Sequence, residues 1–214
     1  MEDVLDVYQR PLDPKRPLVT LDEGSKQLLD DSRPPLPMQP PQGERAAHPV
    51  REDYEYVREG TCSFFMMFAP LLCWRKVAVT QRRTAVDFAG VVKDLVEKYF
   101  PDADKIVLVL DNLNTHTAAS LYEAFEPAEA KRLADKLEIH YTPKHGSWLN
   151  MAEIELSVLG RQCLDRRLPD VTRLTDEIAA WEQARNAAEK TVHWHFTTAD
   201  ARIKLKKLYP KILP

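Results

Sequence analysis

A run of five apolar residues, IVLVL (106–110), places the strongest constraint on how this chain can fold. A stretch so uniformly apolar is typical of a strand that lies in the interior of a protein. The run ends on Asp111, and the polar residues NLNTHT follow at once. A buried strand that stops on a carboxylate indicates either an ordinary exit into a loop or one wall of an active site.

Apolar periodicity divides the rest of the chain into an early group of strands and a later alternation of helices and strands. The patterns predict strands at 16–24, 54–69, 71–81, 105–111 and 137–143. They predict helices at 84–101, 117–124, 127–136, 151–164, 174–190 and 198–210. This order predicts an α/β fold with a mixed five-stranded sheet, in which an antiparallel meander joins parallel strands and helices flank the faces.

Two segments stand apart from this pattern. Residues 1–16 are expected to form a charged lead-in, so the domain itself is expected to span 17–214. The stretch 31–51 is rich in proline, which is incompatible with a helix or a central strand. It predicts a long loop inside the domain, extended over part of its length.

Composition restricts the class of protein. The chain has 214 residues, 44% hydrophobic and 29% charged, as expected of a soluble globular domain. Its net charge of −3 argues mildly against a nucleic-acid partner, although the part from residue 141 onward carries a net positive charge. Three cysteines without a CxxC pair indicate a reducing compartment and no zinc knuckle. The chain shows no signal peptide and no membrane-length apolar run, so a cytoplasmic location without membrane contact is predicted.

Three acids fall at positions where a sheet can bring them together. Asp22 closes the first predicted strand, Asp111 closes the strand at 105–111, and Glu153 lies in the first turn of the helix at 151–164. The ends of adjacent strands meet at one edge of a sheet, and the next helix packs over that edge. Carboxylate oxygens are the usual ligands of Mg²⁺, and a pair of such ions can activate an attacking oxygen and stabilise a leaving one.

Each acid also has a purely structural interpretation when it is considered alone. Asp22 can be a turn former, Asp111 can cap a helix or a turn, and Glu153 can be an acid favoured by the helix dipole. Glu155 competes with Glu153, because two residues apart on a helix they face nearly opposite ways.

Three segments together carry a family resemblance: LVTLDE (18–23), LVLDNLNTHT (108–117) and YTPKHGSWLNMAEIELSVL (141–159). They resemble the catalytic domain of the DDE transposases, in particular the insertion-sequence 630 branch of the mariner-like superfamily. The resemblance extends along nearly the whole chain. It implies an RNase H-like fold and a site for two Mg²⁺ ions, which Mn²⁺ can replace, held by Asp22, Asp111 and Glu153. In this family the third acid follows Leu-Asn by three residues, which selects Glu153 over Glu155.

The resemblance also implies a reaction and partners. The family cleaves phosphodiesters at transposon ends and transfers the freed 3′-OH into target DNA. Double-stranded DNA is therefore the expected partner. The protein is expected to act on it as a homodimer, in the bacterial cytoplasm at the nucleoid. Members usually carry an N-terminal helix-turn-helix DNA-binding domain, and none fits ahead of Asp22 in this sequence. Two alternatives remain: a different RNase H-like nuclease, or a truncated, non-autonomous transposase that dimerises with the full-length enzyme and inhibits it.

Further polar residues near the acids are candidates for supporting roles. Lys144, His145, Arg82 and Arg83 are candidate contacts to the DNA backbone. Trp148 can stack on a base, although a role as an anchor of the core is favoured. The remaining candidates could hold the acids in place or cap the following helix: Asn112, Asn114, His116 and Asn150.

Overall fold

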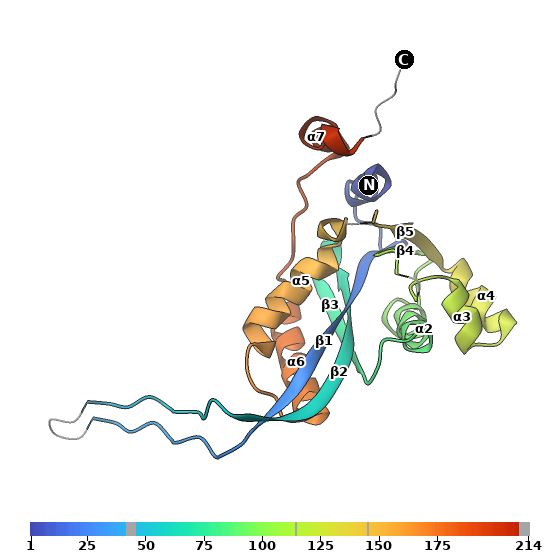
Figure 1. Cartoon of the computed structure of the whole chain (residues 1–214). Coiled ribbons are helices and arrows are strands. Elements are labelled where there is room, and N and C mark those ends of the chain that lie inside the picture. Colours follow the sequence, from blue (N-terminus) through green and yellow to red (C-terminus); the bar gives the residue numbers. More distant parts are fainter. Residues whose placement is uncertain (42–45, 114, 145, 210–214) are drawn as a thin grey trace.

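The computed structural model describes residues 1–41, 46–113, 115–144 and 146–209, and its centre is a five-stranded sheet (Figure 1). The strands lie in the order β3-β2-β1-β4-β5. Their bounds are β1 Leu18–Asp31, β2 Tyr56–Ala69, β3 Trp74–Thr80, β4 Ile106–Leu110 and β5 Leu137–Tyr141. β2 pairs antiparallel with β1 and β3, whereas β4 pairs parallel with β1 and β5. The predicted mixed sheet of a meander plus parallel strands is confirmed.

Helices cover both faces of the sheet (Figure 1). One layer consists of α2 (Ala85–Asp94), α3 (Ala119–Ala124) and α4 (Pro127–Asp135). The other consists of α1 (Glu2–Tyr8), α5 (Met151–Leu159), α6 (Val171–Ala187) and α7 (Thr198–Lys204). Single π turns extend two of the helices, at Leu95–Tyr99 after α2 and at Gly160–Leu164 after α5, and short 3₁₀ turns occur at Pro70–Leu72, Ser147–Leu149 and Lys206–Leu208.

β4 is buried on both sides, as its composition predicts. Its alternate residues Val107 and Val109 pack into the core under α5 and α6. Ile106, Leu108 and Leu110 pack into the second core, under α2, α3 and α4. A strand with apolar side chains on both faces can lie only between two layers of helices. This central position fixes where its carboxyl end, and therefore Asp111, is placed.

β1 is much longer than the short strand predicted to end at Asp22 and Glu23. It continues to Asp31 because β2 pairs with it from Thr20 onward, whereas its pairing with β4 covers only Leu18, Val19 and Thr20. Asp22 therefore lies inside β1, at the point where the strand loses its parallel neighbour. Beyond this point β1 and β2 form a ribbon that leaves the body of the domain.

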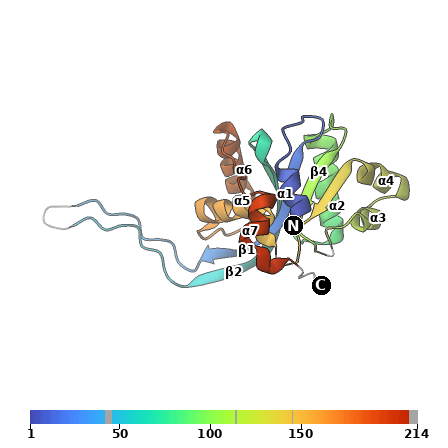
Figure 2. The same ribbon diagram turned by 90° about the horizontal axis from the view of Figure 1, so that it is seen from above.

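The described part of the proline-rich stretch 31–51 continues this ribbon as an extended arm (Figures 1 and 2). Two isolated bridges join its two sides, Leu36 with Arg51 and Gln39 with His48. Apolar side chains on the arm and its base remain exposed, including Leu36, Met38 and Tyr54. The loop is extended, as predicted, and it projects away from the core.

The first residues are more ordered than a charged lead-in. They contain α1, whose side chains Val4, Leu5 and Val7 are buried in the core next to α5 and α7. The Tyr8 hydroxyl donates a 2.6 Å hydrogen bond to the carbonyl of Leu149, close to the start of α5. α1 therefore supports the helix on which Glu153 lies. Among the described residues, the helices are too short or too polar to cross a membrane.

Candidate active site

The parallel pairing of β1 with β4 brings Asp22 and Asp111 to the same edge of the sheet. Thr20 of β1 lies opposite Val109 of β4, and two residues further on the strands reach Asp22 and Asp111. β4 ends at Leu110, so Asp111 begins the loop that follows. Two acids that are distant in sequence thus stand side by side where the parallel part of the sheet ends.

Asn150 connects Asp22 to the beginning of α5. This fully buried residue caps the helix, because its side-chain oxygen accepts a 3.1 Å hydrogen bond from the backbone N–H of Ala152. Its side-chain amide donates to the carbonyl of Leu21 at 2.9 Å and to Oδ2 of Asp22 at 3.2 Å. The cap therefore fixes both the start of α5 and the orientation of the Asp22 carboxylate.

The two competing acids of α5 have different surroundings. Glu153 lies in the first turn of the helix, close to the Asn150 cap, and it is exposed. Glu155 is fully buried and forms ion pairs with the guanidinium groups of Arg75, at 2.8 Å, and Arg185, at 2.7 Å. Glu155 is thus engaged in a buried network between β3, α5 and α6, and Glu153 is the acid of α5 that remains accessible to a ligand.

The electrostatics of Asp22 indicate that the acids act on one another. The pKa of the Asp22 carboxyl is raised to about 7, mainly by burial and to a smaller extent by the negative charges of Glu23, Asp111 and Glu153, while the Glu23 backbone N–H lowers it. Clustered carboxylates that repel one another in this way favour the binding of a cation among them. An all-oxygen donor set of this kind suits Mg²⁺ or Mn²⁺.

Asp111 is held by a histidine on its other side. Oδ1 of Asp111 lies 2.5 Å from Nδ1 of His116, and the backbone N–H of Leu113 approaches the same oxygen at 3.4 Å. The His116 ring is buried and packs against Phe88 of α2, with 4.9 Å between the ring centroids. The structure thus places His116 next to Asp111, and its role in orienting this acid stays a prediction.

One residue of this cluster was not singled out by the sequence analysis. Glu23 follows Asp22 in β1 and points to the opposite face of the sheet, where its Oε2 lies 3.2 Å from Nε2 of His116. Its other oxygen lies 3.4 Å from the guanidinium of Arg83. The signal for it in the sequence was its position next to Asp22, at the end of the predicted strand.

The predicted DNA contacts lie around this cluster to different degrees. Lys144 and Asn112 are exposed and line a hollow beside Asp111, together with Thr142 and Ser147. Arg82 and Arg83 are exposed just before α2. Asn114 and His145 lie outside the described residues.

Trp148 has features of both of its predicted roles. Its ring stacks on Trp194 at 6.4 Å and meets Phe196 edge-on at 5.8 Å, so it anchors the segment that leads to α7. It is nevertheless 42% exposed, which leaves part of the ring open to a ligand. A core anchor was favoured, and the packing on Trp194 is consistent with it.

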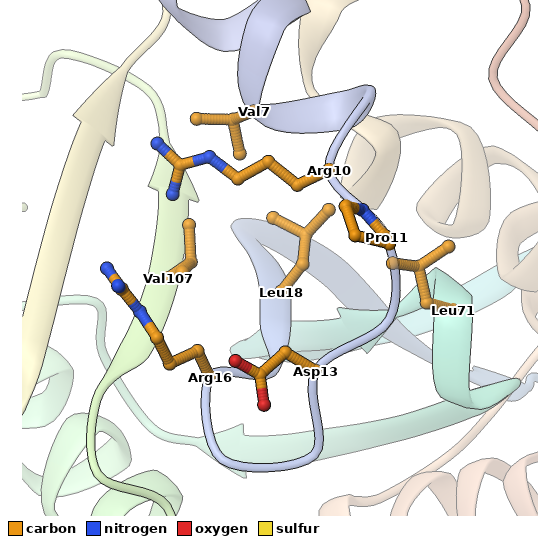
Figure 3. A pocket seen from close by; sticks show the side chains of 8 residues that line it. All are labelled: Val7, Arg10, Pro11, Asp13, Arg16, Leu18, Leu71 and Val107. Carbon is orange, nitrogen blue, oxygen red and sulfur yellow. The ribbon is translucent and has the colours of Figure 1, made fainter.

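A separate cavity lies toward the other end of β1 and does not include the acids (Figure 3). Its wall includes the apolar side chains of Leu18 and Val107 and the charged side chains of Arg10 and Arg16. Both arginines form ion pairs with the same carboxylate, that of Glu138 of β5. We therefore assign the chemistry to the acid cluster and not to this cavity.

Comparison with known proteins agrees with the geometry of the acid cluster. Residues 17–175 match the family model of the DDE superfamily endonuclease, which is more than half of the chain. The chain belongs to the DDE superfamily of endonucleases. A search of curated proteins found no match.

Solved structures of the Mos1 transposase share the fold of this DDE endonuclease domain. The Mos1 mariner paired end complex with Mn has a TM-score of 0.58 at 15% identity, over 88% of this chain and 55% of the other. The Mos1 strand transfer complex has a TM-score of 0.57 at 16% identity, over 86% and 51%. The paired end complex with Mg has a TM-score of 0.53 at 14% identity, over 86% and 53%. The predicted RNase H-like α/β fold is confirmed, and the chain spans about half the length of the Mos1 chains it matches.

Proposed function

We propose that this DDE endonuclease domain is the catalytic domain of a transposase of the insertion-sequence 630 branch, which cleaves transposon ends and joins them to target DNA. One observation carries the proposal: Asp22 and Asp111 stand side by side at the edge of the sheet, and the negative charge of Glu153 reaches the same place. The match to the DDE family model and the shared fold with Mos1 support it.

The three acids fit a pair of divalent cations. Asp22, Asp111 and Glu153 would hold two Mg²⁺ ions, or Mn²⁺ in their place, and such ions supply charge neutralisation and an acidified water when they are bound. The donor set is entirely oxygen, and the pKa of Asp22 is raised by burial and by the neighbouring negative charges, both of which a bound cation would counteract.

The protein groups around the acids would then orient two successive displacements at phosphorus. Asn150 holds Asp22 and His116 holds Asp111, so the carboxylates keep their positions while the DNA moves. In the first displacement a water attacks a transposon-end phosphodiester and releases a 3′-OH. In the second, this 3′-OH attacks a phosphodiester of the target DNA. Lys144 lies exposed beside Asp111, Arg82 is exposed just before α2, and both would contact the phosphate backbone.

We further propose that the domain works on double-stranded DNA as a homodimer. The arm formed by residues 31–55 extends away from the body and exposes apolar side chains that its own domain does not cover. A second copy would cover them, since exposed apolar surface of this kind is typical of interaction sites. A location at the bacterial nucleoid follows from the same proposal and stays a prediction.

A cleavage assay on defined DNA tests the proposal. Labelled linear duplexes that carry the flanking ends of the element are incubated with the protein and Mg²⁺ or Mn²⁺, next to RNA–DNA hybrids and branched junctions. We expect metal-dependent nicking of the linear ends, and Asp111→Asn should abolish it while the circular dichroism spectrum is unchanged. The exposed Asp102→Asn serves as a control and should cleave normally. Nicking by Asp111→Asn, or cleavage confined to hybrids or junctions, would reject the transposase assignment.

A further inference from the structure

Glu23 takes part in a continuous chain of contacts that passes beneath the proposed metal ligands. Its carboxylate is only 8% exposed, and Oε2 lies 3.2 Å from Nε2 of His116. Nδ1 of the same ring lies 2.5 Å from Oδ1 of Asp111. One buried imidazole, 1% exposed, thus lies between a carboxylate of β1 and a carboxylate that follows β4.

The alternation of side chains along β1 explains how neighbouring acids come to act in different layers. Successive residues of a strand point to opposite faces of the sheet. Asp22 faces α5, where Asn150 donates to it, whereas Glu23 faces the layer of α2 and the His116 ring. Each of the two aspartates therefore has its own support: Asn150 for Asp22, and His116 with Glu23 for Asp111.

We propose that Glu23 is a positioning residue for the metal site, which acts on Asp111 through His116. This inference rests on the proposed function, because it assumes that Asp111 is a metal ligand. Nδ1 of His116 lies at hydrogen-bond distance from Oδ1 of Asp111. Glu23 faces Nε2 on the far side of the ring at 3.2 Å, although its buried Oε2 has no hydrogen-bond partner among the described residues, and Phe88 packs on the ring. These two contacts restrict the rotation of the ring. Outer partners of this kind typically contribute about 10- to 100-fold to metal affinity.

Glu23, Asp111 and His116 each offer one possible ligand atom, and these atoms lie within 4.8 Å of one another. Glu23 could therefore bind a cation directly instead of positioning Asp111. The geometry favours positioning, because Nδ1 of His116 and Oδ1 of Asp111 approach to 2.5 Å, which is a hydrogen-bond distance with no space for an ion between the two atoms. The two roles differ in the number of ions that the protein binds.

The test measures metal binding directly on the full chain in the absence of DNA. Mn²⁺ titrations followed by electron paramagnetic resonance and calorimetry give the affinity and the number of ions for the wild type, Glu23→Gln, His116→Gln and the double variant. Glu182→Gln is the matched control: this carboxylate is 12% exposed, pairs with Lys76 and accepts from the backbone N–H of Val77, on the side of the sheet covered by α6. Thermal melts show that each variant is folded.

We expect Glu23→Gln and His116→Gln to weaken Mn²⁺ binding by roughly 10-fold or more at an unchanged number of ions, and Glu182→Gln to bind as the wild type does. The double variant should bind no more weakly than His116→Gln alone, because both changes break one chain of contacts. If Glu23→Gln binds Mn²⁺ with wild-type affinity, the role of Glu23 is refuted and the proposed function is not affected. The loss of one whole ion would make Glu23 a ligand and would also overturn the positioning role. A wild type that binds no Mn²⁺ would overturn the proposed function as well.

Discussion

Replacing each of the two glutamates of α5 by glutamine distinguishes a residue needed for catalysis from a residue needed for stability. Glu153 and Glu155 are two positions apart, and the same substitution at each changes a carboxylate to an amide of nearly equal size. We expect Glu153→Gln to abolish metal-dependent cleavage with little change in stability. We expect Glu155→Gln to destabilise the domain strongly.

The magnitude follows from the burial of the Glu155 network. Glu155 and Arg75 both have fully buried side chains, and Arg185 approaches the same carboxylate with 17% of its side chain exposed. Burial lowers the pKa of Arg75 and the charge of Glu155 opposes this, so the carboxylate is what stabilises the buried guanidinium. Removing one partner of such a pair typically costs about 3–5 kcal/mol, a large part of the roughly 5–15 kcal/mol that stabilises a domain. Glu153 is exposed, so its replacement should change the free energy of unfolding by less than about 0.5 kcal/mol.

Urea unfolding followed by circular dichroism gives the two free energies, and nicking of a labelled transposon end gives the activities. The midpoint of Glu155→Gln should fall well below the wild type at an unchanged slope, and its residual folded fraction should still cleave. The assignment is refuted if Glu155→Gln is as stable as the wild type and inactive, or if Glu153→Gln cleaves at the wild-type rate.

Two further perturbations test the site and the arm. Asp22→Asn should stabilise the metal-free protein at pH 8, by on the order of 1–3 kcal/mol, because the folded state raises the pKa of this carboxyl from 3.8 to about 7 and therefore binds its proton more tightly than the unfolded chain does. The contribution of Asp22 to stability is thus greatest below pH 4 and is lost as the pH rises through 7. The gain in melting temperature of Asp22→Asn over the wild type should therefore vanish at pH 4. A gain of equal size at pH 4 and pH 8 would contradict this explanation. Replacing residues 33–52 by a short Gly-Ser linker should give a folded monomer by light scattering if the arm mediates dimerisation, and an unchanged molar mass would assign the dimer to another surface.

The fold was predictable where one signal dominates a segment. β4 was clear because all five of its residues are apolar, and Asp111 was singled out because it follows that run directly. The helix predicted to begin at residue 84 begins at its Thr84 cap, and Thr84 and Asp87 form both hydrogen bonds of a capping box. In each case the determining residues are neighbours in the sequence, so the sequence contains the whole signal.

The features that the sequence did not predict depend on residues far apart in the chain. The second half of β1 has polar side chains, and it is a strand only because β2 pairs with it. α1 is a seven-residue helix, too short to stand out by periodicity, and it is stabilised by packing under α5 and α7. The contact of Glu23 with His116 joins residues of two different layers, and no spacing rule reports it.

The packing of α1 against α7 brings the first and last described helices of the chain together (Figure 2). Arg202 of α7 forms a bidentate ion pair with Glu2, and the Thr198 hydroxyl donates to Asp6. The proximity of α1 and α7 allows the order of the elements in the sequence to be rearranged without moving them in space. A circularly permuted gene that joins α7 to α1 through a linker and opens within the arm should therefore retain the sheet and the acid cluster. The two sides of the arm would then be free ends, to which tethers or labels could be attached at a distance from the catalytic edge.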